Sequence, residues 1–455
     1  MRRRHLLHAV SAAGLSISTA RLFAATTAPA AAPPADLGLE KPGAPVPVEA
    51  NAEHAQASER RGAPAPQASG EVSEVGEVGE GRPRFLLVFL RGGYDATNLL
   101  VPIGSSFYYE QRPRIAVARP SASDPAAALP LDADWGLHPA LRQSVYRLAQ
   151  SGQVRFIPFA GTEDLSRSHF ETQDSIELGQ PIGGTRNYNS GFLNRLAAEL
   201  DARQALSFTD QLPIAFRGPA RIANAGLRET ARPAVDAKNR VLITRMYEGQ
   251  ALGGAVEEGL ALREELARDL SPDRMKAMTD AAGRNAIPAR GFELEARRIA
   301  ALMRGRFSLG FIDVGGWDTH VNQGGATGQL ANRFEELGRG LAAIADELGP
   351  GLWRQTTVMV ISEFGRTFRE NGNRGTDHGH GSVYWLLGGG LASGGPVAGD
   401  QVSLTATTLF QNRDYPVLND YRAVLGGLWR RQFGLSDAAL ARVFPGAQPK
   451  ELRLV

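Results

Sequence analysis

Histidines and carboxylates are gathered in a few polar loops of this sequence. Of the eight histidines, three precede the first strand-like run and one, His138, stands at a predicted helix start. The other four lie in polar loops after predicted strands, near three carboxylates: His169, His320, His378 and His380, with Asp318, Glu363 and Asp377. Neutral imidazole combined with carboxylates is the usual donor set for Zn or Mn, whereas carboxylate oxygens alone suit Mg or Ca. These residues therefore predict a site for one or two divalent metal ions.

The spacing of these residues supports the same chemistry. In extended backbone, side chains two residues apart point to the same side. Asp318 and His320 have this spacing, and so do His378 and His380. Glu363 stands where its predicted strand ends. The alternative for each pair is a loop carboxylate that only orients a histidine. If the loops meet at one edge of a sheet, the metal site is favoured.

Ser168 is the candidate nucleophile or oxyanion-binding residue. It stands between Arg167 and His169 near a predicted helix start. Free backbone N–H groups and the helix dipole favour a phosphate or sulfate at such a position. The alternative is that Ser166 or Ser168 caps the helix, and the local sequence favours this role. Thr162 is a weaker candidate for the same chemistry.

Two arginines also follow predicted strand ends. Arg91 and Arg366 could each bind an anionic group of a substrate through the planar guanidinium. The alternative is a salt bridge to Asp95 or Glu363. Asp95 and Asn98 could themselves reach a metal ion or cap a turn, and the sequence does not separate these roles.

The elements that must position these loops have the pattern of an α/β protein. Continuous apolar runs predict buried strands at 85–90, 154–160, 308–314, 356–362 and 382–387. Helices are predicted from 166 or 168 to 178, in the segment before 356 that carries an apolar stripe, and at 419–433. The alternation of strand and helix favours a mainly parallel sheet.

The region at about 190–306 is predicted to be a mostly helical insertion. Its helices are expected at 191–200, 249–269 and 275–286. A short apolar run at 212–217 is interpreted as a strand.

Composition describes an ordinary globular protein without a nucleic-acid surface. The 455 residues are 43% hydrophobic and 22% charged, with a formal net charge of +2. Four arginines are the only charged residues among the first 25, and without them the net charge falls to −2: Arg2, Arg3, Arg4 and Arg21. Cysteine is absent, which excludes disulfides, thiolate metal sites and a cysteine nucleophile.

The amino-terminal segment predicts export. Residues 1–25 combine a basic start, a mild apolar stretch and small residues, which is typical of a signal peptide. The arginine cluster resembles a twin-arginine signal, and a general secretory signal or an uncleaved anchor is the alternative. Residues 26–82 are a low-complexity linker. We therefore expect a periplasmic protein with no stable membrane span after signal cleavage, tethered to the membrane if the signal is retained.

Six motifs in combination resemble the domain of unknown function family 1501. They are Leu90-Arg-Gly-Gly-Tyr-Asp-Ala-Thr-Asn98, Leu137-His-Pro139, Arg167-Ser-His-Phe170, Gly315-Gly-Trp-Asp-Thr-His320, Ser362-Glu-Phe-Gly-Arg-Thr367 and Asp377-His-Gly-His380. The family is similar to the alkaline phosphatase and sulfatase superfamily. This resemblance implies an alkaline phosphatase-like α/β domain over 83–455, with a mainly parallel central sheet, helices on both faces and a site at the strand ends.

The superfamily pattern carries over in part. Its nucleophile resembles Ser168, its Asp-xxx-His ligand pair resembles Asp318 and His320 at a shorter spacing, and its last histidine ligand resembles His380. Its Asp-His pair resembles Glu363 and the following Phe by position, or Asp377 and His378 by residue type.

The largest departure from the pattern lies after the first strand. The superfamily places a metal-binding aspartate there, whereas this sequence has Arg91-Gly-Gly, and Asp95 comes only later. Half of a two-metal site is therefore missing or rebuilt.

These observations predict an exported, metal-dependent hydrolase that acts on a small anionic phosphate or sulfate ester. The alternative is a non-catalytic exported protein that binds or assembles with a protein partner on the same scaffold. A serine esterase is less favoured because Ser168 lacks the Gly-x-Ser-x-Gly pattern.

Overall fold

The structure is a computed structural model that describes residues 81–227, 237–250, 252–269 and 291–455. These all belong to one compact unit, Ser73–Val455. The predicted signal segment, almost all of the predicted linker and the predicted helix at 275–286 lie outside the described residues. Among the helices described, none combines the length and the apolar character that crossing a membrane requires.

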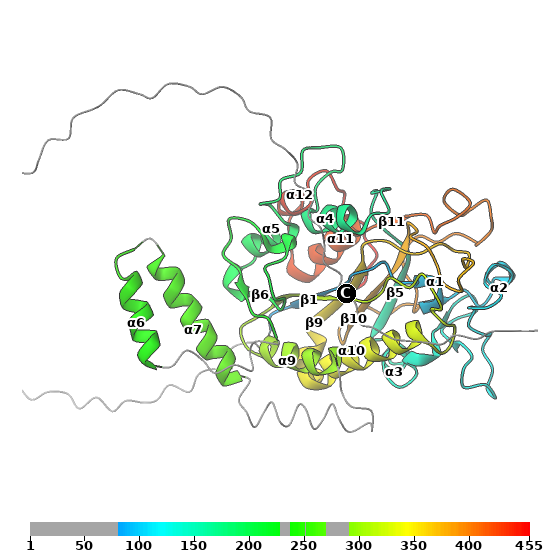
Figure 1. Ribbon diagram of the computed structural model, residues 1–455, viewed down its shortest axis with the longest axis horizontal. Helices are drawn as coiled ribbons and strands as arrows, with labels where there is room; N and C mark the ends of the chain where they lie inside the picture. The colour runs from blue at the N-terminus through cyan, green and yellow to red at the C-terminus, as the bar shows by residue number, and fades with distance from the viewer. Residues whose placement is uncertain (1–80, 228–236, 251, 270–290) are drawn as a thin grey trace, which may run out of the picture. The chain divides into compact units, whose positions relative to one another are not determined.

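An eight-stranded sheet forms the centre of this unit (Figure 1). Its strands, in spatial order, are β11 (Asn419–Asp420), β5 (Val154–Gly161), β10 (Ser382–Gly388), β9 (Thr356–Ser362), β1 (Arg84–Leu90), β8 (Leu309–Val314), β6 (Ala205–Ser207) and β7 (Ala223–Asn224). A separate small sheet consists of β2 (Leu100–Val101), β4 (Gly136–Leu137) and β3 (Leu129–Pro130).

The large sheet is parallel except at β10, which runs antiparallel to both of its neighbours. The chain passes from β9 to β10 without a helix, so β10 enters at the edge where β9 ends and returns in the opposite direction. The prediction of a mixed α/β protein with a mainly parallel sheet is confirmed.

Helices cover both faces of the sheet. The helices of the described residues are α1 (Ala96–Leu99), α2 (Ser106–Gln111), α3 (Val145–Gln150), α4 (His169–Leu178), α5 (Phe192–Glu199), α6 (Ala237–Tyr247), α7 (Gly253–Asp269), α9 (Phe292–Arg304), α10 (Gln329–Arg354), α11 (Tyr421–Phe433) and α12 (Asp437–Val443). Short 3₁₀ helices are η1 (Pro139–Leu141), η2 (Ala202–Gln204) and η3 (Ile214–Phe216).

Strand β1 shows how one buried strand supports two cores. Leu86, Val88 and Leu90 pack with the apolar sides of α9 and α10. Phe85 and Phe89 point to the other face, where residues of α5, α11 and α12 surround them. Figure 1 shows the two helical layers on opposite sides of the sheet. The predicted apolar stripe before β9 is thus confirmed as the buried side of α10.

The predicted strand at 212–217 is wrong, because this segment contains the 3₁₀ helix η3. Pro213 precedes η3 with φ −67°, and proline can neither donate to a strand ladder nor continue one in a central position. A short apolar run does not by itself distinguish a strand from a helical turn. The inserted region also adds β6 and β7 to the sheet beside β8, so it contributes strands as well as helices.

His138 is a structural residue of this fold. Its side chain is fully buried, with Nε2 2.9 Å from the Gly325 carbonyl, while Nδ1 accepts a hydrogen bond from the Ala140 N–H at 3.2 Å. Burial lowers the pKa of His138 to about 4, against a smaller opposing effect of the Gly325 carbonyl. The ring is therefore neutral in the folded protein near pH 6.

Replacing His138 by glutamine should make the free energy of unfolding less dependent on pH below about 6.5. The unfolded chain binds a proton at His138 near pH 6.5, whereas the folded chain binds it only near pH 4. Stability is therefore lost as pH falls from 6.5 to 4, by up to about 3 kcal/mol at this one residue. Urea unfolding of wild type and His138→Gln at several pH values checks this. Parallel profiles for the two proteins would contradict it.

Candidate functional site

Five strand ends bring the polar loops to one edge of the sheet. Leu90 of β1 is in register with Val314 of β8 and Ser362 of β9, so the residues that follow these strands lie together. Ser382 begins β10 opposite Ala160, near the end of β5. The loop that enters β10 therefore reaches the same edge as the loops that leave β1, β5, β8 and β9.

Three side chains from different loops form the centre of the site. His169, Asp318 and His378 each offer one donor atom, and these atoms lie within 4.8 Å of one another. His169 Nε2 is 3.5 Å from Asp318 Oδ2, and His378 Nε2 is 3.3 Å from Asp318 Oδ1. His169 comes from the start of α4, Asp318 from the loop after β8, and His378 from the loop before β10.

A fourth residue, His320, lies beside these three. Its Nε2 atom is 2.8 Å from Asp318 Oδ1 and 3.1 Å from His378 Nε2. Asp318 thus contacts three imidazoles through its two carboxylate oxygens. We call His169, Asp318, His320 and His378 the histidine cluster.

Each imidazole of the histidine cluster is held at Nδ1 by an oxygen atom. The Nδ1 atom of His169 is 2.8 Å from Glu363 Oε1, that of His320 is 3.2 Å from Asp377 Oδ1, and that of His378 is 2.9 Å from the Arg167 carbonyl. Histidines that bind metal ions usually donate Nδ1–H or Nε2–H to such partners, which orients the other nitrogen. This pattern leaves all three Nε2 atoms as acceptors.

The ionisation of the carboxylates supports this assignment of protons. Burial acts to raise the pKa of Glu363, but hydrogen bonds from His169, Gln173 and the Gly92 N–H bring it below its usual value. The pKa of Asp377 is likewise lowered: burial acts to raise it, but hydrogen bonds from Asn371 and His320, with the charges of His320 and Arg413, bring it below its usual value. Ionised carboxylates only accept, so the imidazoles must donate to them.

Three nitrogen atoms in the histidine cluster have a geometry that favours a cation. Arg366 Nη1 lies 3.3 Å from His320 Nε2, and because guanidinium only donates, this Nε2 carries no proton. The lone pairs of His320 and His378 then face each other across 3.1 Å, which is repulsive without a proton or a cation between them. In addition, the buried Nε2 atom of His169 has no hydrogen-bond partner in the described part of the chain. The residues therefore fit a metal ion.

Arg366 places a positive charge directly against the histidine cluster. Its buried guanidinium contacts Asp318 Oδ1 and donates to the carbonyl oxygens of Gly92, at 2.5 Å, and Gly93. Burial acts to raise the pKa of Asp318, but Arg366, together with His320 and His169, brings it below its usual value. Burial also lowers the pKa of His378, while the hydrogen bond to Glu363 raises that of His169.

The glycines after β1 make this arrangement possible. Gly92 has φ +124°, and its N–H donates to Glu363 Oε1 at 2.8 Å. A Cβ atom at Gly92 would lie 2.7 Å from the Asp318 backbone nitrogen, and one at Gly93 would lie 2.4 Å from the Phe364 ring. After β1, this chain thus uses backbone groups to position Glu363 and Arg366.

Arg91 lies near the histidine cluster, but carboxylates occupy its guanidinium. It contacts Asp313 Oδ2 at 2.6 Å and Glu177 Oε1 at 2.9 Å, rather than Asp95 or Glu363. Its Nη1 atom also donates to Gln173 Oε1 at 2.8 Å. The proposed binding of an anionic substrate group by Arg91 therefore has no free guanidinium to support it.

Asp95 is not part of the histidine cluster. Its carboxylate forms a fully buried bidentate pair with Arg112, at 2.6 and 3.0 Å, and accepts from Gln323 Nε2 at 2.6 Å. Asn98 accepts from the same guanidinium at 2.9 Å. Neither of the two roles expected for Asp95, metal ligand or turn cap, is seen, because Arg112 takes both carboxylate oxygens.

His380 is also placed away from the histidine cluster. The chain bends at this residue instead of continuing as an extended strand, so the rule that places His378 and His380 on one side does not apply. The ring of His380 packs against Phe410 with centroids 4.9 Å apart. The pKa of His380 is lowered to about 4, mainly by burial and to a smaller extent by the charge of Arg167.

Ser168 occupies the N-cap position of α4, next to His169. Its hydroxyl makes no cap hydrogen bond, and it has no other hydrogen bond in the described ranges, so the expected capping role is not observed. Arg167 has the left-handed backbone value φ +52°, which turns its carbonyl to His378. The Arg167 side chain binds Asp414 at 2.8 Å and Gln411 at 2.6 Å.

One supporting residue was not predicted from the sequence. Gln173 bridges Arg91 and Glu363, because its Nε2 donates to Glu363 Oε1 at 2.8 Å while its Oε1 accepts from Arg91. Gln173 lies four residues after His169 on α4, and residues at this spacing share one side of a helix. That spacing was the signal that could have identified it.

The histidine cluster is open to solvent, and apolar side chains stand next to it in the chain. The Asp318 side chain is 44% exposed. Leu165, Phe170 and Val321 are exposed by 52%, 84% and 52%, and the last two directly follow His169 and His320. A metal ion held here could contact a molecule from solution, and that molecule could rest on apolar side chains.

Comparison with curated proteins found none that matches this chain. The family described as "Protein of unknown function (DUF1501)" matches residues 82–444, which include every strand of the sheet and every residue of the histidine cluster. The chain therefore belongs to this family of proteins of unknown function.

Proposed function

We propose that the protein is an exported, periplasmic, metal-dependent hydrolase that acts on a phosphate or sulfate ester, on a scaffold of the alkaline phosphatase type. The observation that carries the proposal is the convergence of three imidazole Nε2 atoms on Asp318, each ring being held at Nδ1 by an oxygen acceptor. Ligands with oriented outer partners are typical of functional metal sites.

One divalent ion suits the described residues better than two. His169, Asp318 and His378 would hold it, with His320 beside them, and this mixture of nitrogen and oxygen donors favours Zn or Mn over Mg or Ca. Asp95 and His380, which would be needed for a second ion, have other partners. A bound ion would act as a Lewis acid that stabilises negative charge on the ester.

The surrounding residues would bind the ester and supply the attacking group. The Ser168 hydroxyl lies at the start of the ten-residue helix α4, where free N–H groups favour an anion, and would attack or orient the attacking water. Arg366 is fully buried and paired with protein groups, so it would not touch the ester and would act only by balancing the negative charge of Asp318. The exposed rings and alkyl groups of Phe170, Leu165 and Val321 favour an ester with an apolar substituent.

The alternative function is a non-catalytic exported protein that binds a protein partner. It is favoured by the first strand, where the superfamily's aspartate is replaced by Arg91-Gly-Gly and the guanidinium of Arg91 is paired with carboxylates. In that case the metal ion would stabilise the fold without turnover.

Metal analysis and ester hydrolysis by the purified mature chain test the proposal. We expect about one equivalent of Zn or Mn per chain and turnover of 4-nitrophenyl phosphate or 4-nitrophenyl sulfate. Ser168→Ala should lower kcat at least about 100-fold while metal content stays unchanged, because the hydroxyl would react but not bind the ion. Activity that survives chelation would contradict the role of the metal ion. Activity that survives in Ser168→Ala would contradict the role of the hydroxyl. Bound metal without turnover of either ester would favour the alternative.

A further inference from the structure

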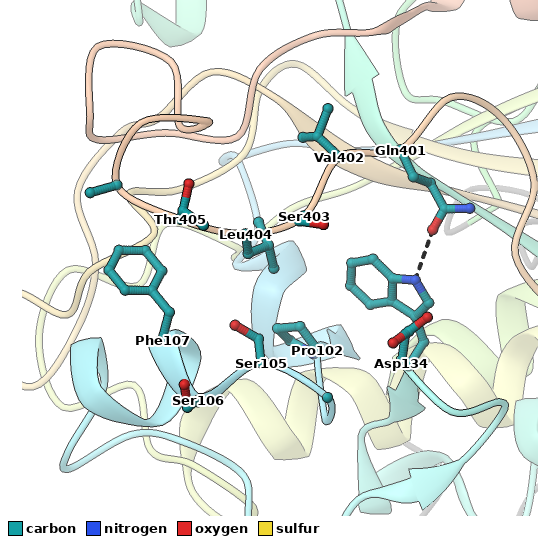
Figure 2. Close-up of a pocket in the computed structure, with 13 residues that line it drawn as sticks. Pro102, Ser105, Ser106, Phe107, Asp134, Gln401, Val402, Ser403, Leu404 and Thr405 are labelled. Atoms are coloured by element: carbon teal, nitrogen blue, oxygen red, sulfur yellow. Dashed lines mark hydrogen bonds between the residues drawn. The ribbon is translucent and has the colours of Figure 1, made fainter.

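A cleft separate from the histidine cluster lies between segments that are distant in the sequence (Figure 2). Its volume is about 830 Å³, within the range of small-ligand sites. Three segments line it, 102–107, 134–135 and 401–406, and none of them contributes to the histidine cluster. Figure 2 shows Ser105, Ser106 and Phe107 on one side of the cleft and residues 401–405 facing them.

The polar groups of this cleft are neutral, with one exception. Hydroxyls and an amide line it, Asp134 supplies the one carboxylate among the lining residues, and these contain no Lys, Arg or His. Within the described part of the chain, the hydroxyls of Ser105, Ser106 and Ser403 make no hydrogen bond as donors or acceptors. These hydroxyls are free to bind a ligand.

Apolar surface stands between these polar groups. Trp135, Phe107, Leu404 and Pro102 line the same cleft. The indole of Trp135 is fixed because Nε1 donates to Gln401 Oε1 at 2.8 Å, which leaves the Gln401 amide N–H₂ as a donor. The ring of Phe107 is fixed by stacking on Phe368, with centroids 5.1 Å apart and planes at 10°. The cleft therefore presents the fixed ring of Phe107, with little surface from Trp135 because that residue is only 6% exposed, beside free neutral hydrogen-bonding groups.

We propose that this cleft binds a neutral, polyhydroxylated ligand, namely an oligosaccharide. An anionic ligand would meet Asp134 without a compensating cation, and a purely apolar ligand would strip water from the free hydroxyls without replacing their hydrogen bonds. A neutral sugar avoids both problems. Its hydroxyls exchange hydrogen bonds with serine, amide and carboxylate groups, and its C–H faces pack on aromatic rings. A peptide is less favoured because no strand of either sheet lines the cleft with open backbone groups.

Titration calorimetry of the purified full chain with neutral hexasaccharides tests the proposal. The probes are the hexamers of cellulose, amylose, laminarin and chitin, and at least one should bind with a millimolar or lower Kd. The double variant Ser105→Ala, Ser403→Ala should weaken that binding about 10-fold, because two hydrogen bonds to the ligand are lost. Both serines are at the surface of loops or helix ends, so the fold should tolerate the change.

A matched surface variant, Ser123→Ala, lies outside the cleft and should leave the affinity unchanged. Absence of binding by all four hexasaccharides would overturn the proposal, and so would binding that the double variant leaves unchanged. Tighter binding of an uncharged Ser-Gly-Ala hexapeptide than of any sugar would assign the cleft to peptides instead. None of these outcomes depends on the metal ion or on ester hydrolysis.

Discussion

His378→Gln should lower the affinity for Zn or Mn by more than about 100-fold, because even the loss of an outer partner of a ligand costs roughly 10- to 100-fold. His378 offers Nε2 at 3.3 Å from Asp318 Oδ1, and its Nδ1 atom is fixed by the Arg167 carbonyl. Glutamine keeps a polar side chain of similar length but has no imidazole nitrogen to offer. Competition for the metal with a chromophoric chelator measures the effect.

His380→Gln is the matched control for this variant. The two histidines are separated only by Gly379, yet His380 packs on Phe410 outside the histidine cluster. The control should keep the wild-type metal affinity, although stability can change because the ring is buried. Equal loss of affinity in both variants would show that the loop binds metal in another arrangement and would contradict the assignment.

Asp95→Ala should lower the free energy of unfolding by about 3–5 kcal/mol, because it leaves the buried guanidinium of Arg112 without its counter-charge. Arg112 also donates to the carbonyl oxygens of Phe368, at 2.6 Å, and Thr367, at 3.0 Å, so the change should loosen the segment that follows Arg366. Urea unfolding measures the loss of stability.

An exposed ion pair provides the comparison for Asp95. Asp201 contacts Arg203 at 3.2 Å, and the Arg203 side chain is largely exposed, so Arg203→Ala should cost less than about 1 kcal/mol while Asp201 keeps its hydrogen bond to the backbone N–H of residue 203. If Asp95→Ala destabilises the protein no more than Arg203→Ala, the buried pair does not support the fold as described. If it instead removes a metal ion from an otherwise stable fold, the original expectation of a ligand role would be right.

The central strands could be predicted because burial on both faces produces continuous apolar runs. The segment 85–90 is such a run, and in the structure it belongs to β1, which has a parallel strand on each side. The direction of β10 could not be read in the same way. It depends on the absence of a helix between β9 and β10, and a run of buried residues has the same composition in either direction.

Members of the histidine cluster could be predicted where a residue type that binds metal ions directly follows a strand ending at this edge of the sheet. Asp318 and His320 follow a strand that the sheet places beside β1, and the spacing of two brings both to one point. The same spacing does not bring His380 to this point, because a bend ends the extended backbone there. The pairing of Asp95 could not be predicted, because its partner Arg112 is 17 residues away in a segment whose position only tertiary packing defines.

The contacts that hold Glu363 have a consequence for the order in which the chain folds. Glu363 binds the Gly92 N–H across 271 residues of sequence and His169 across 194. Contacts between such distant segments form late, because the entropy of closing long loops must be offset before they become stable. The four side chains of the histidine cluster cannot meet until ribosomal synthesis has passed residue 378. Any metal ion that all four bind is therefore acquired only after residue 378 has been synthesised, and metal availability in the compartment where folding is completed contributes to which ion is selected.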